Sequence, residues 1–167
     1  MTKKEIEFLR ESNAIEGVFS NLMLQQAQIA WEYLKDQKVL NTAIILTTHR
    51  ILMFHSLLKS NEKGYFRTEP VYIGGREGLE HHLIPGYIDG WCNDAMTTIK
   101  VPGKNGKNIQ LDHIEYEKIH PFLDGNGRTG RMFLNWERLQ AKLPILIIKA
   151  SERNVYYEWF RTNSEPA

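Results

Sequence analysis

Residues 120–131, HPFLDGNGRTGR, bring together side chains suited to acid–base and phosphate chemistry. His120 has the ordinary pKa that proton transfer near neutral pH requires. Gly125 and Gly127 flank Asn126, and a Gly-Asn-Gly loop that opens a helix can direct successive backbone N–H groups toward one anion. The segment therefore predicts a general base beside an anion-binding site.

The charged residues of this segment indicate that the anion is a polyphosphate. Arg128 and Arg131 lie three residues apart, so on a helix they would share a face, about 4.5 Å apart along the axis. Two guanidinium groups suit several phosphates better than one carboxylate. Asp124 would repel a phosphate unless a hard cation lay between them, so the pattern predicts a Mg²⁺ ligand at Asp124.

The glycines of residues 125–130 also match the glycine pattern of dinucleotide-binding folds. That pattern needs a buried strand before the loop. Residues 112–119 are amphipathic and predict a helix instead. A Walker phosphate loop is excluded as well, because no Gly-Lys-Ser/Thr follows.

The elements that must position these residues are mostly helices, so the sequence predicts an all-α fold. The exception is residues 64–75, where two short β-favouring runs flank Glu69-Pro70 and predict a small hairpin, a flap on a helical body. Residues 104–107 predict a loop. Caps and apolar spacing predict helices at residues 3–16, 21–37, 42–59, 86–99, 109–119, 127–142 and 152–162.

Length and composition limit the class of protein. A chain of 167 residues predicts one domain. The net charge of +1 gives no overall attraction to nucleic acid or membrane. A single cysteine, Cys92, fits a reducing compartment. The N-terminus has no apolar run typical of a secretory signal, and no run of 18 apolar residues occurs, so we expect a cytoplasmic protein.

Residues 120–131 resemble the signature of the Fic (filamentation induced by cAMP) family, His-Pro-Phe-x-Asp/Glu-Gly-Asn-Gly-Arg-x-x-Arg. The resemblance covers nearly the whole chain and implies a Fic-like helical bundle. It implies one Fic domain over residues 1–167, with the active site in a helix-loop-helix at residues 109–142. It also implies that the β-hairpin flap binds a target protein, through Tyr72 and Ile73.

The resemblance further implies a protein adenylyltransferase, which transfers AMP from ATP to a Tyr, Thr or Ser hydroxyl of a target protein. His120 would be the catalytic base, and Asp124 would hold Mg²⁺ or Mn²⁺. Arg153 and Tyr156-Tyr157 resemble the family's last helix, near the nucleotide base. The nucleotide-binding residues would be Gly125, Asn126, Gly127, Arg128 and Arg131.

Residues 12–17, SNAIEG, resemble the family's inhibitory motif, Ser/Thr-x-x-x-Glu-Asn/Gly. This likeness implies that residues 1–20 form an inhibitory helix segment carrying Ser12 and Glu16. Glu16 would pair with Arg131 and block the γ-phosphate. On the residues alone, a glutamate in the last turn of a helix is disfavoured by the helix dipole, so either a cationic partner or a plain surface position is open.

Several alternatives stay open from the sequence. The same core could transfer another nucleotide, phosphate or phosphocholine, or it could remove AMP with Glu16 positioning a water. A binding module without catalysis is a third alternative, against which His120 and Asp124 argue. The expected partners are ATP and a target protein, with neither nucleic acid nor membrane, and homo-oligomerisation is left open. At this length we expect no second, target-recruiting domain.

The remaining histidines have simpler interpretations. His49 and His55 fall in the apolar third helix, and both are expected to be core or boundary residues. His113 lies seven residues before His120 and is expected to have a structural role. The adjacent residues 81–82 are expected to be exposed, because no further metal ligand converges on them.

Overall fold

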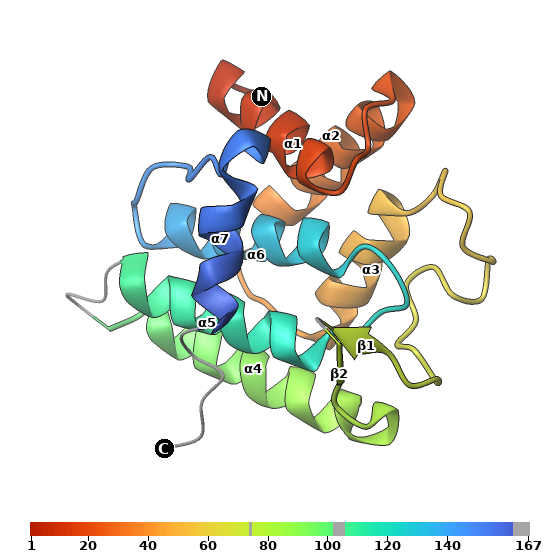
Figure 1. Ribbon diagram of the computed structural model, residues 1–167. Helices are drawn as coiled ribbons and strands as arrows, with labels where there is room; N and C mark the ends of the chain where they lie inside the picture. Colours follow the sequence, from red (N-terminus) through yellow and green to blue (C-terminus); the bar gives the residue numbers. More distant parts are fainter. Residues whose placement is uncertain (74, 102–105, 162–167) are drawn as a thin grey trace.

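The computed structural model describes residues 1–73, 75–101 and 106–161, and most of these lie in helices (Figure 1). The expected all-α fold with a small hairpin is confirmed. The elements in chain order are α1 (Lys3–Ile15), α2 (Asn21–Lys35), α3 (Thr42–Leu52), β1 (Tyr72–Ile73), β2 (Arg76–Glu77), η1 (His81–Leu83), α4 (Ile84–Thr98), α5 (Gly106–Ile119), α6 (Asn126–Gln140), η2 (Ala150–Glu152) and α7 (Arg153–Arg161).

Helix α6 lies at the centre of the bundle and contacts α1, α2, α3 and α5. Every residue from Arg128 to Glu137 is buried. A helix that is buried on all sides must lie inside the fold. Its polar side chains then need partners from the surrounding helices, because an unpaired buried polar group is costly.

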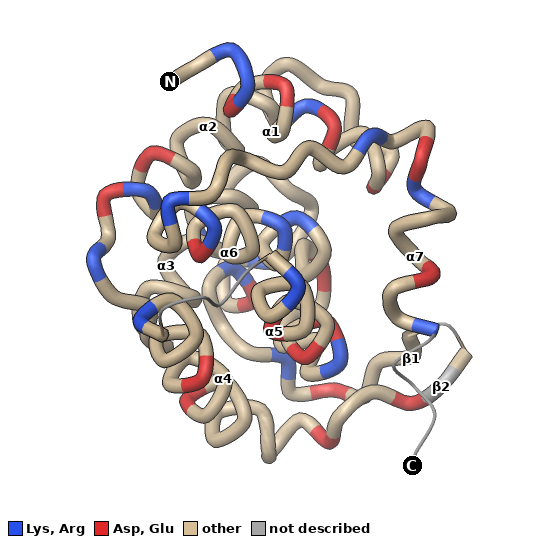
Figure 2. Tube along the Cα trace, turned by 90° about the vertical axis from the view of Figure 1, so that its left-hand side faces the viewer, with Lys and Arg blue, Asp and Glu red and all other residues tan. Residues whose placement is uncertain are grey.

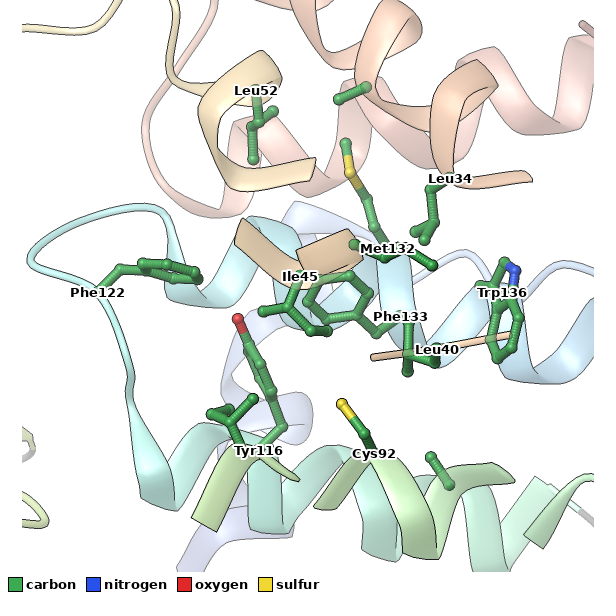
Figure 3. Packing of buried hydrophobic residues seen from close by; sticks show 14 of the residues in the cluster. Leu34, Leu40, Ile45, Leu52, Cys92, Tyr116, Phe122, Met132, Phe133 and Trp136 are labelled. Carbon is green, nitrogen blue, oxygen red and sulfur yellow. The ribbon is translucent and has the colours of Figure 1, made fainter. Parts of the chain in front are cut away.

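The apolar core surrounds the inward faces of α3, α4 and α6 (Figure 3). Phe133 and Trp136 of α6 are fully buried, as is Ile45 of α3. Figure 3 also shows Phe122 projecting from the loop between α5 and α6 toward this cluster. Phe122 has no exposed surface, so the loop is anchored to the core by one aromatic side chain.

Helix α1 is held against α2 by a polar cluster as well as by apolar packing. Thr2 and Glu5 form a capping box, in which each side chain bonds to the other's backbone N–H. The Glu5 carboxylate also accepts hydrogen bonds from the Trp31 indole (3.1 Å) and from Lys35 Nζ (3.2 Å). Phe8 packs edge-on against the same Trp31 ring. The beginning of α1 is therefore fixed in place.

The third helix is shorter than predicted, and the expectation that it reaches residue 59 is wrong. The helix ends at Leu52, and two apolar residues beyond it, Phe54 and Leu57, are exposed. The Gly64 N–H donates to His49 Nδ1 (2.9 Å), which requires the chain to leave the helix and fold back. His49 is buried as expected, whereas the expectation for His55 is wrong, since it is exposed.

The flap is also displaced along the chain from its predicted place. The two strands pair Tyr72 with Glu77 and Ile73 with Arg76, so they do not flank Glu69-Pro70 as predicted. The segment before them stays irregular because Arg67 is buried and donates to the carbonyls of several separate segments. Gly74, at the end of the predicted hairpin, lies outside the described residues.

Two helices begin two or three residues before their predicted starts. Helix α4 begins at Ile84, with a proline in its first turn, where a missing N–H is tolerated. Helix α5 begins at Gly106, so half of the predicted loop at residues 104–107 belongs to it. Residues 104 and 105 lie outside the described part. No helix in the described ranges combines the length and apolar content that crossing a membrane takes.

The anchor of α1 predicts a specific dependence of stability on pH. Burial would raise the pKa of Glu5, but hydrogen bonds from Thr2, Trp31 and Lys35 outweigh it and lower the pKa from 4.5 to about 2. The stabilisation is therefore fully present above pH 4.5 and is lost as the pH falls toward 2. Glu5→Gln should lower the free energy of unfolding at pH 7 by about 1–3 kcal/mol, and this difference should vanish near pH 2.

Urea unfolding followed by circular dichroism between pH 2 and pH 7 measures this difference. Glu7→Gln is the matched control, because Glu7 is exposed on the same helix, and it should change stability by less than about 0.5 kcal/mol. The same pH dependence for Glu5→Gln and wild type would contradict the assignment.

Candidate active site

His120 follows directly on the last residue of α5, in a strained backbone conformation. Its φ is 48°, in the left-handed region that few non-glycine residues adopt. Its N–H donates to the Tyr116 carbonyl (3.1 Å), and its carbonyl accepts from Arg67 Nε (2.8 Å). Such a conformation persists where the surroundings fix it, often at a functional site. The backbone of His120 is therefore held from both sides.

The loop after His120 is fixed by side chains that the sequence did not single out for this task. The Asn126 side chain accepts from the Phe122 N–H (2.9 Å) and donates to the Phe122 carbonyl (2.8 Å). His49 stacks on the Phe122 ring at 3.6 Å, and its Nε2 is 2.9 Å from the Asp124 carbonyl. The Asn126 side chain is thus used within the loop, and its backbone N–H is the part that can meet an anion.

The loop leads into α6 through a glycine that caps the helix. Gly125 has φ 84° and lies against Met53, so a side chain would be both strained and obstructed there. The Gly125 N–H donates to Asp124 Oδ1 (2.6 Å), whereas the first N–H groups of the helix itself have no intrahelical acceptor. We call the backbone of residues 125–127 the anion nest. It borders a cavity of about 120 Å³ that Glu16, His120, Leu123, Asp124 and Arg128 also line.

The side chains of Arg128 and Asp124 add charge to this cavity. Arg128 is 4% exposed, and its Nη2 is 3.3 Å from both carboxylate oxygens of Asp124. Arg128 Nε is buried without a hydrogen-bond partner among the described residues. Figure 2 shows basic and acidic residues interspersed along the trace, so the positive charge at the site is local.

Asp124 is the one candidate metal ligand that the sequence indicated, and its carboxylate is accessible. Its side chain is 58% exposed at the edge of the cavity. Within the described ranges, no cluster of three or more His, Cys, Asp or Glu residues could hold a metal ion. A divalent ion at Asp124 would therefore need oxygen ligands from a bound molecule, as Mg²⁺ commonly has from phosphates.

Arg131 does not point freely into the cavity but is bonded to α1. Its Nη2 donates to Glu16 Oε1 (2.7 Å) and to the Ser12 carbonyl (2.9 Å), and its Nε donates to Ser12 Oγ (2.9 Å). A side chain at Gly127 would collide with Glu16 Oε1 and crowd Arg131. The Glu16 carboxylate consequently rests against the anion nest, while its inhibitory role stays a prediction.

Helix α7 holds the other side of Arg131. The Tyr156 ring lies 5.5 Å from the guanidinium carbon, and its hydroxyl accepts from Arg131 Nη1 at 3.4 Å. The same hydroxyl is 2.8 Å from His113 Nε2. Burial, then the charge of Arg131, lower the pKa of His113 to about 3, so this histidine is neutral. Tyr156 packs on Arg131, whereas Tyr157 is 41% exposed.

The environment of His120 keeps its imidazole neutral. Burial lowers the pKa of His120 below its ordinary value, although nearby backbone and carboxylate groups oppose this. Sequence reasoning missed Glu117, whose Oε2 is 3.9 Å from His120 Nδ1. The signal was present, because residues three apart on a helix are neighbours. A neutral imidazole at neutral pH is the form that can accept a proton.

The flap lies beside the site rather than in it. Tyr72 is 74% exposed, and neither it nor Ile73 is among the described residues that line the cavity. Arg67 connects the two parts, since its N–H donates to the Pro121 carbonyl and its side chain to the Leu79 carbonyl. Sequence reasoning gave no sign of these long-range bonds of Arg67.

Comparisons with known proteins match this chain to one family. Residues 40–137 match the model of the Fic/DOC family. Proteins named "Protein adenylyltransferase Fic" from Aedes aegypti and Drosophila melanogaster are each 32% identical to this chain over 130 residues, which is 72% of this chain and 24% of theirs. The chain thus spans about a quarter of the length of these curated relatives.

Two solved structures share the fold. A Fic domain containing signaling protein from Bacteroides thetaiotaomicron matches with a TM-score of 0.79 at 21% identity, over 99% of this chain and 74% of the other. Fic-1 from C. elegans matches with a TM-score of 0.82 at 20% identity, over 97% of this chain and 56% of the other.

The contacts of Arg131 predict that Ser12 contributes to stability. Ser12→Ala removes the acceptor of Arg131 Nε and leaves a buried donor unpaired, which should lower the free energy of unfolding by about 1–3 kcal/mol. Ser20→Ala is the control, because Ser20 is exposed and its side chain makes no cap bond. Chemical denaturation compares the two, and equal losses would show that Ser12 is not a specific partner.

Proposed function

The chain belongs to the Fic/DOC family, and on that premise we propose that it is a protein adenylyltransferase, transferring AMP from ATP to a Tyr, Thr or Ser hydroxyl of a target protein. The observation that carries the proposal is the placement of a neutral histidine, His120, at the edge of the same cavity as the anion nest. A base and a phosphate site in one cavity are what nucleotidyl transfer to a hydroxyl requires.

The nucleotide phosphates would bind to the nest and to the two arginines. The N–H groups of Asn126 and Gly127 open α6, and a helix N-terminus favours negative charge. Arg128 lines the cavity, and Arg131 would offer a guanidinium after Glu16 moves away. The present cavity of about 120 Å³ is smaller than the several hundred Å³ typical of ligand pockets, so the nucleotide needs that movement.

Mg²⁺ or Mn²⁺ fits the donor set at Asp124. This carboxylate is exposed at the cavity edge, and a single carboxylate together with phosphate oxygens is a common arrangement for Mg²⁺. When bound, the ion would offset phosphate charge, and it would let an anionic side chain lie next to an anionic ligand. Asp124 would hold it while Arg128 stays within reach of the same carboxylate.

The chemical step needs one proton transfer and one displacement at phosphorus. His120 accepts the proton of the target hydroxyl as the hydroxyl oxygen bonds to the α-phosphorus. The bond from this phosphorus to the bridging oxygen breaks, and pyrophosphate leaves with its charge stabilised by Arg128 and the nest. The product is an AMP ester of the target. The protein contributes position and charge stabilisation.

The acceptor segment of the target would approach along the flap. Tyr72 and Ile73 are on the hairpin, and an extended peptide can add main-chain bonds to a strand edge. A second cavity of about 360 Å³, lined by residues between 59 and 69, borders Leu123. Leu123 also lines the first cavity, so a segment lying there would bring a hydroxyl toward His120.

Residues 1–20 would act as an inhibitory segment of the single domain formed by residues 1–167. The contact of Glu16 with Arg131 (2.7 Å) supports this role. A carboxylate at that position neutralises the arginine and lies where a phosphate oxygen would bind. Two anions at one position repel each other strongly. ATP would therefore bind weakly, or with its α-phosphorus misaligned, until α1 moves away.

A second candidate is removal of AMP from a modified protein. The observation that favours it is that Glu16 and His120 line the same cavity, where a carboxylate could orient a water for attack on the phosphodiester. The two candidate functions assign opposite roles to Glu16. In the first, Glu16 blocks the transfer of AMP, and in the second it promotes the removal of AMP.

Incubation of a cell lysate with α-labelled ATP, CTP, GTP or UTP, followed by mass spectrometry of labelled proteins, tests the proposal directly. We expect label from ATP on protein hydroxyls, lost with a chelator or with Asp124→Ala. Label from another nucleotide would mean that ATP is not the substrate. Nucleotide binding without protein labelling by any of the four nucleotides would contradict the assignment as a transferase. Release of AMP from prelabelled protein would favour the second candidate.

Replacement of His120 separates chemistry from binding. In a Glu16→Gly background, His120→Ala should lower transfer by about 10²–10⁴-fold while ATP affinity changes little, because a base acts in the chemical step. His82→Ala is the control, since His82 is exposed and distant in sequence. Rates come from label incorporation and affinities from calorimetry. Transfer by His120→Ala at the parental rate would overturn the mechanism.

Replacement of Glu16 tests the inhibition. Glu16→Gly should raise modification at least about tenfold, which corresponds to about 1.4 kcal/mol. The further change Arg131→Ala should abolish this gain, because the freed arginine is what activation requires. Melting curves must show all variants folded. Equal labelling by wild type and Glu16→Gly at equal ATP binding would remove the inhibitory role.

A further inference from the structure

Glu117 has a largely buried carboxyl group to which the proposed mechanism assigns no role. It lies in the last turn of α5, 14% of its side chain is exposed, and its Oε1 is buried without a hydrogen-bond partner among the described residues. His120 Nδ1 is buried, makes no hydrogen bond of normal geometry and lies 3.9 Å from Glu117 Oε2, while the backbone of Glu117 is also close enough to raise the pKa of His120. A buried carboxyl group and a buried imidazole nitrogen are thus neighbours, and a proton shared between Nδ1 and Oε2 would give both of them a partner.

Packing holds the Glu117 carboxyl in this place. A side chain at Gly130 would collide with Glu117 Oε1 and crowd Tyr116, so α6 closes over the carboxyl. The backbone of His120 is independently fixed by Tyr116 and Arg67. What stays adjustable is the rotation of the imidazole ring, and the carboxylate and the backbone of Glu117 both lie near its inner nitrogen.

We propose that Glu117 positions the catalytic base: its carboxylate keeps the imidazole proton of His120 on Nδ1, so that Nε2 is free to receive the proton of the acceptor hydroxyl. The inference rests on the proposed function. A carboxylate behind a histidine also stabilises the imidazolium that forms in the step, as in hydrolytic triads. The distance of 3.9 Å is that of an ion pair, and catalytic hydrogen bonds commonly shorten when substrate binds.

The charges around Glu117 connect this role to the state of α1. Burial raises the pKa of Glu117 to about 7, the positive charge of Arg131 opposes this, and the negative charge of Glu16 adds to it. Departure of Glu16 removes one of the causes that keep the carboxyl protonated. The ionised form, which can hold the Nδ1 proton, is then favoured when the site opens. The titratable groups that face Glu117 are His113, His120, Arg131, Glu16, Tyr116 and Tyr156.

The test compares Glu117→Gln with Glu115→Gln, both in the Glu16→Gly background. Glu115 is exposed on the same helix and pairs with Lys118, so its replacement should leave catalysis unchanged. Glu117→Gln should lower kcat at least about tenfold with KM for ATP within about twofold, since it acts on the chemical step. The acidic limb of the pH profile of kcat/KM should move to lower pH, because loss of the carboxylate lowers the pKa of His120.

Nitrogen-15 NMR of labelled histidine gives a readout that does not need transfer. In the Glu16→Gly protein, the neutral His120 ring should carry its proton on Nδ1, and Glu117→Gln should shift this tautomer while Glu115→Gln should not. Glu117→Asp should restore part of kcat. If no variant transfers label, the proposed function fails, but the NMR comparison still decides the role of Glu117.

Two results would overturn the inference. One is an unchanged kcat and pH profile for a folded Glu117→Gln protein. The other is a His120 ring already protonated on Nε2 in the Glu16→Gly protein, a measurement that does not depend on whether Glu117→Gln folds.

Discussion

The burial of one charge, the guanidinium of Arg131, is the constraint around which this structure is organised. Arg131 is 2% exposed in the middle of the central helix, and a buried charge is tolerated only where partners surround it. Ser12 and Glu16 reach it from α1, and Tyr156 reaches it from α7. The two ends of the described chain are therefore brought to one side chain of the candidate site, so regulation and catalysis would share the same atoms.

The second constraint is the fixing of the loop between α5 and α6. Phe122 is inserted into the core, Asn126 bonds to both of its backbone groups, and His49 stacks on its ring. Arg67 holds the carbonyl side of the same loop. Apolar burial and hydrogen bonds thus combine to hold His120 and the nest in one relative position. Positioning of this kind is the main contribution that a protein makes to phosphoryl and nucleotidyl transfer.

Much of the fold and the residues of the site loop followed from the sequence, because both are local. Helices show their apolar spacing and caps over one or two turns, and residues 120–131 carry base, nest and arginines within twelve positions. The register of the flap was missed because Arg67 takes its partners from segments far away in the chain. The end of α3 was missed for a similar reason, the bond from Gly64 back to His49. Patterns among neighbouring residues do not reveal hydrogen-bond partners that lie far away in the sequence.

Polar bonds hold both ends of α1 in place, at Glu5 and at Glu16. On the proposed function, the Glu16 carboxylate therefore competes with the ATP phosphates as a group attached to the same molecule. When the end with Glu16 detaches, the bonds of Glu5 to Trp31 and Lys35 can persist and keep the helix nearby. The effective concentration of a group on so short a tether lies in the millimolar range. On the proposed function, ATP would therefore compete with a carboxylate whose local concentration does not depend on the protein concentration. The apparent affinity for ATP would be proportional to the fraction of molecules in which the Glu16 end of α1 is detached.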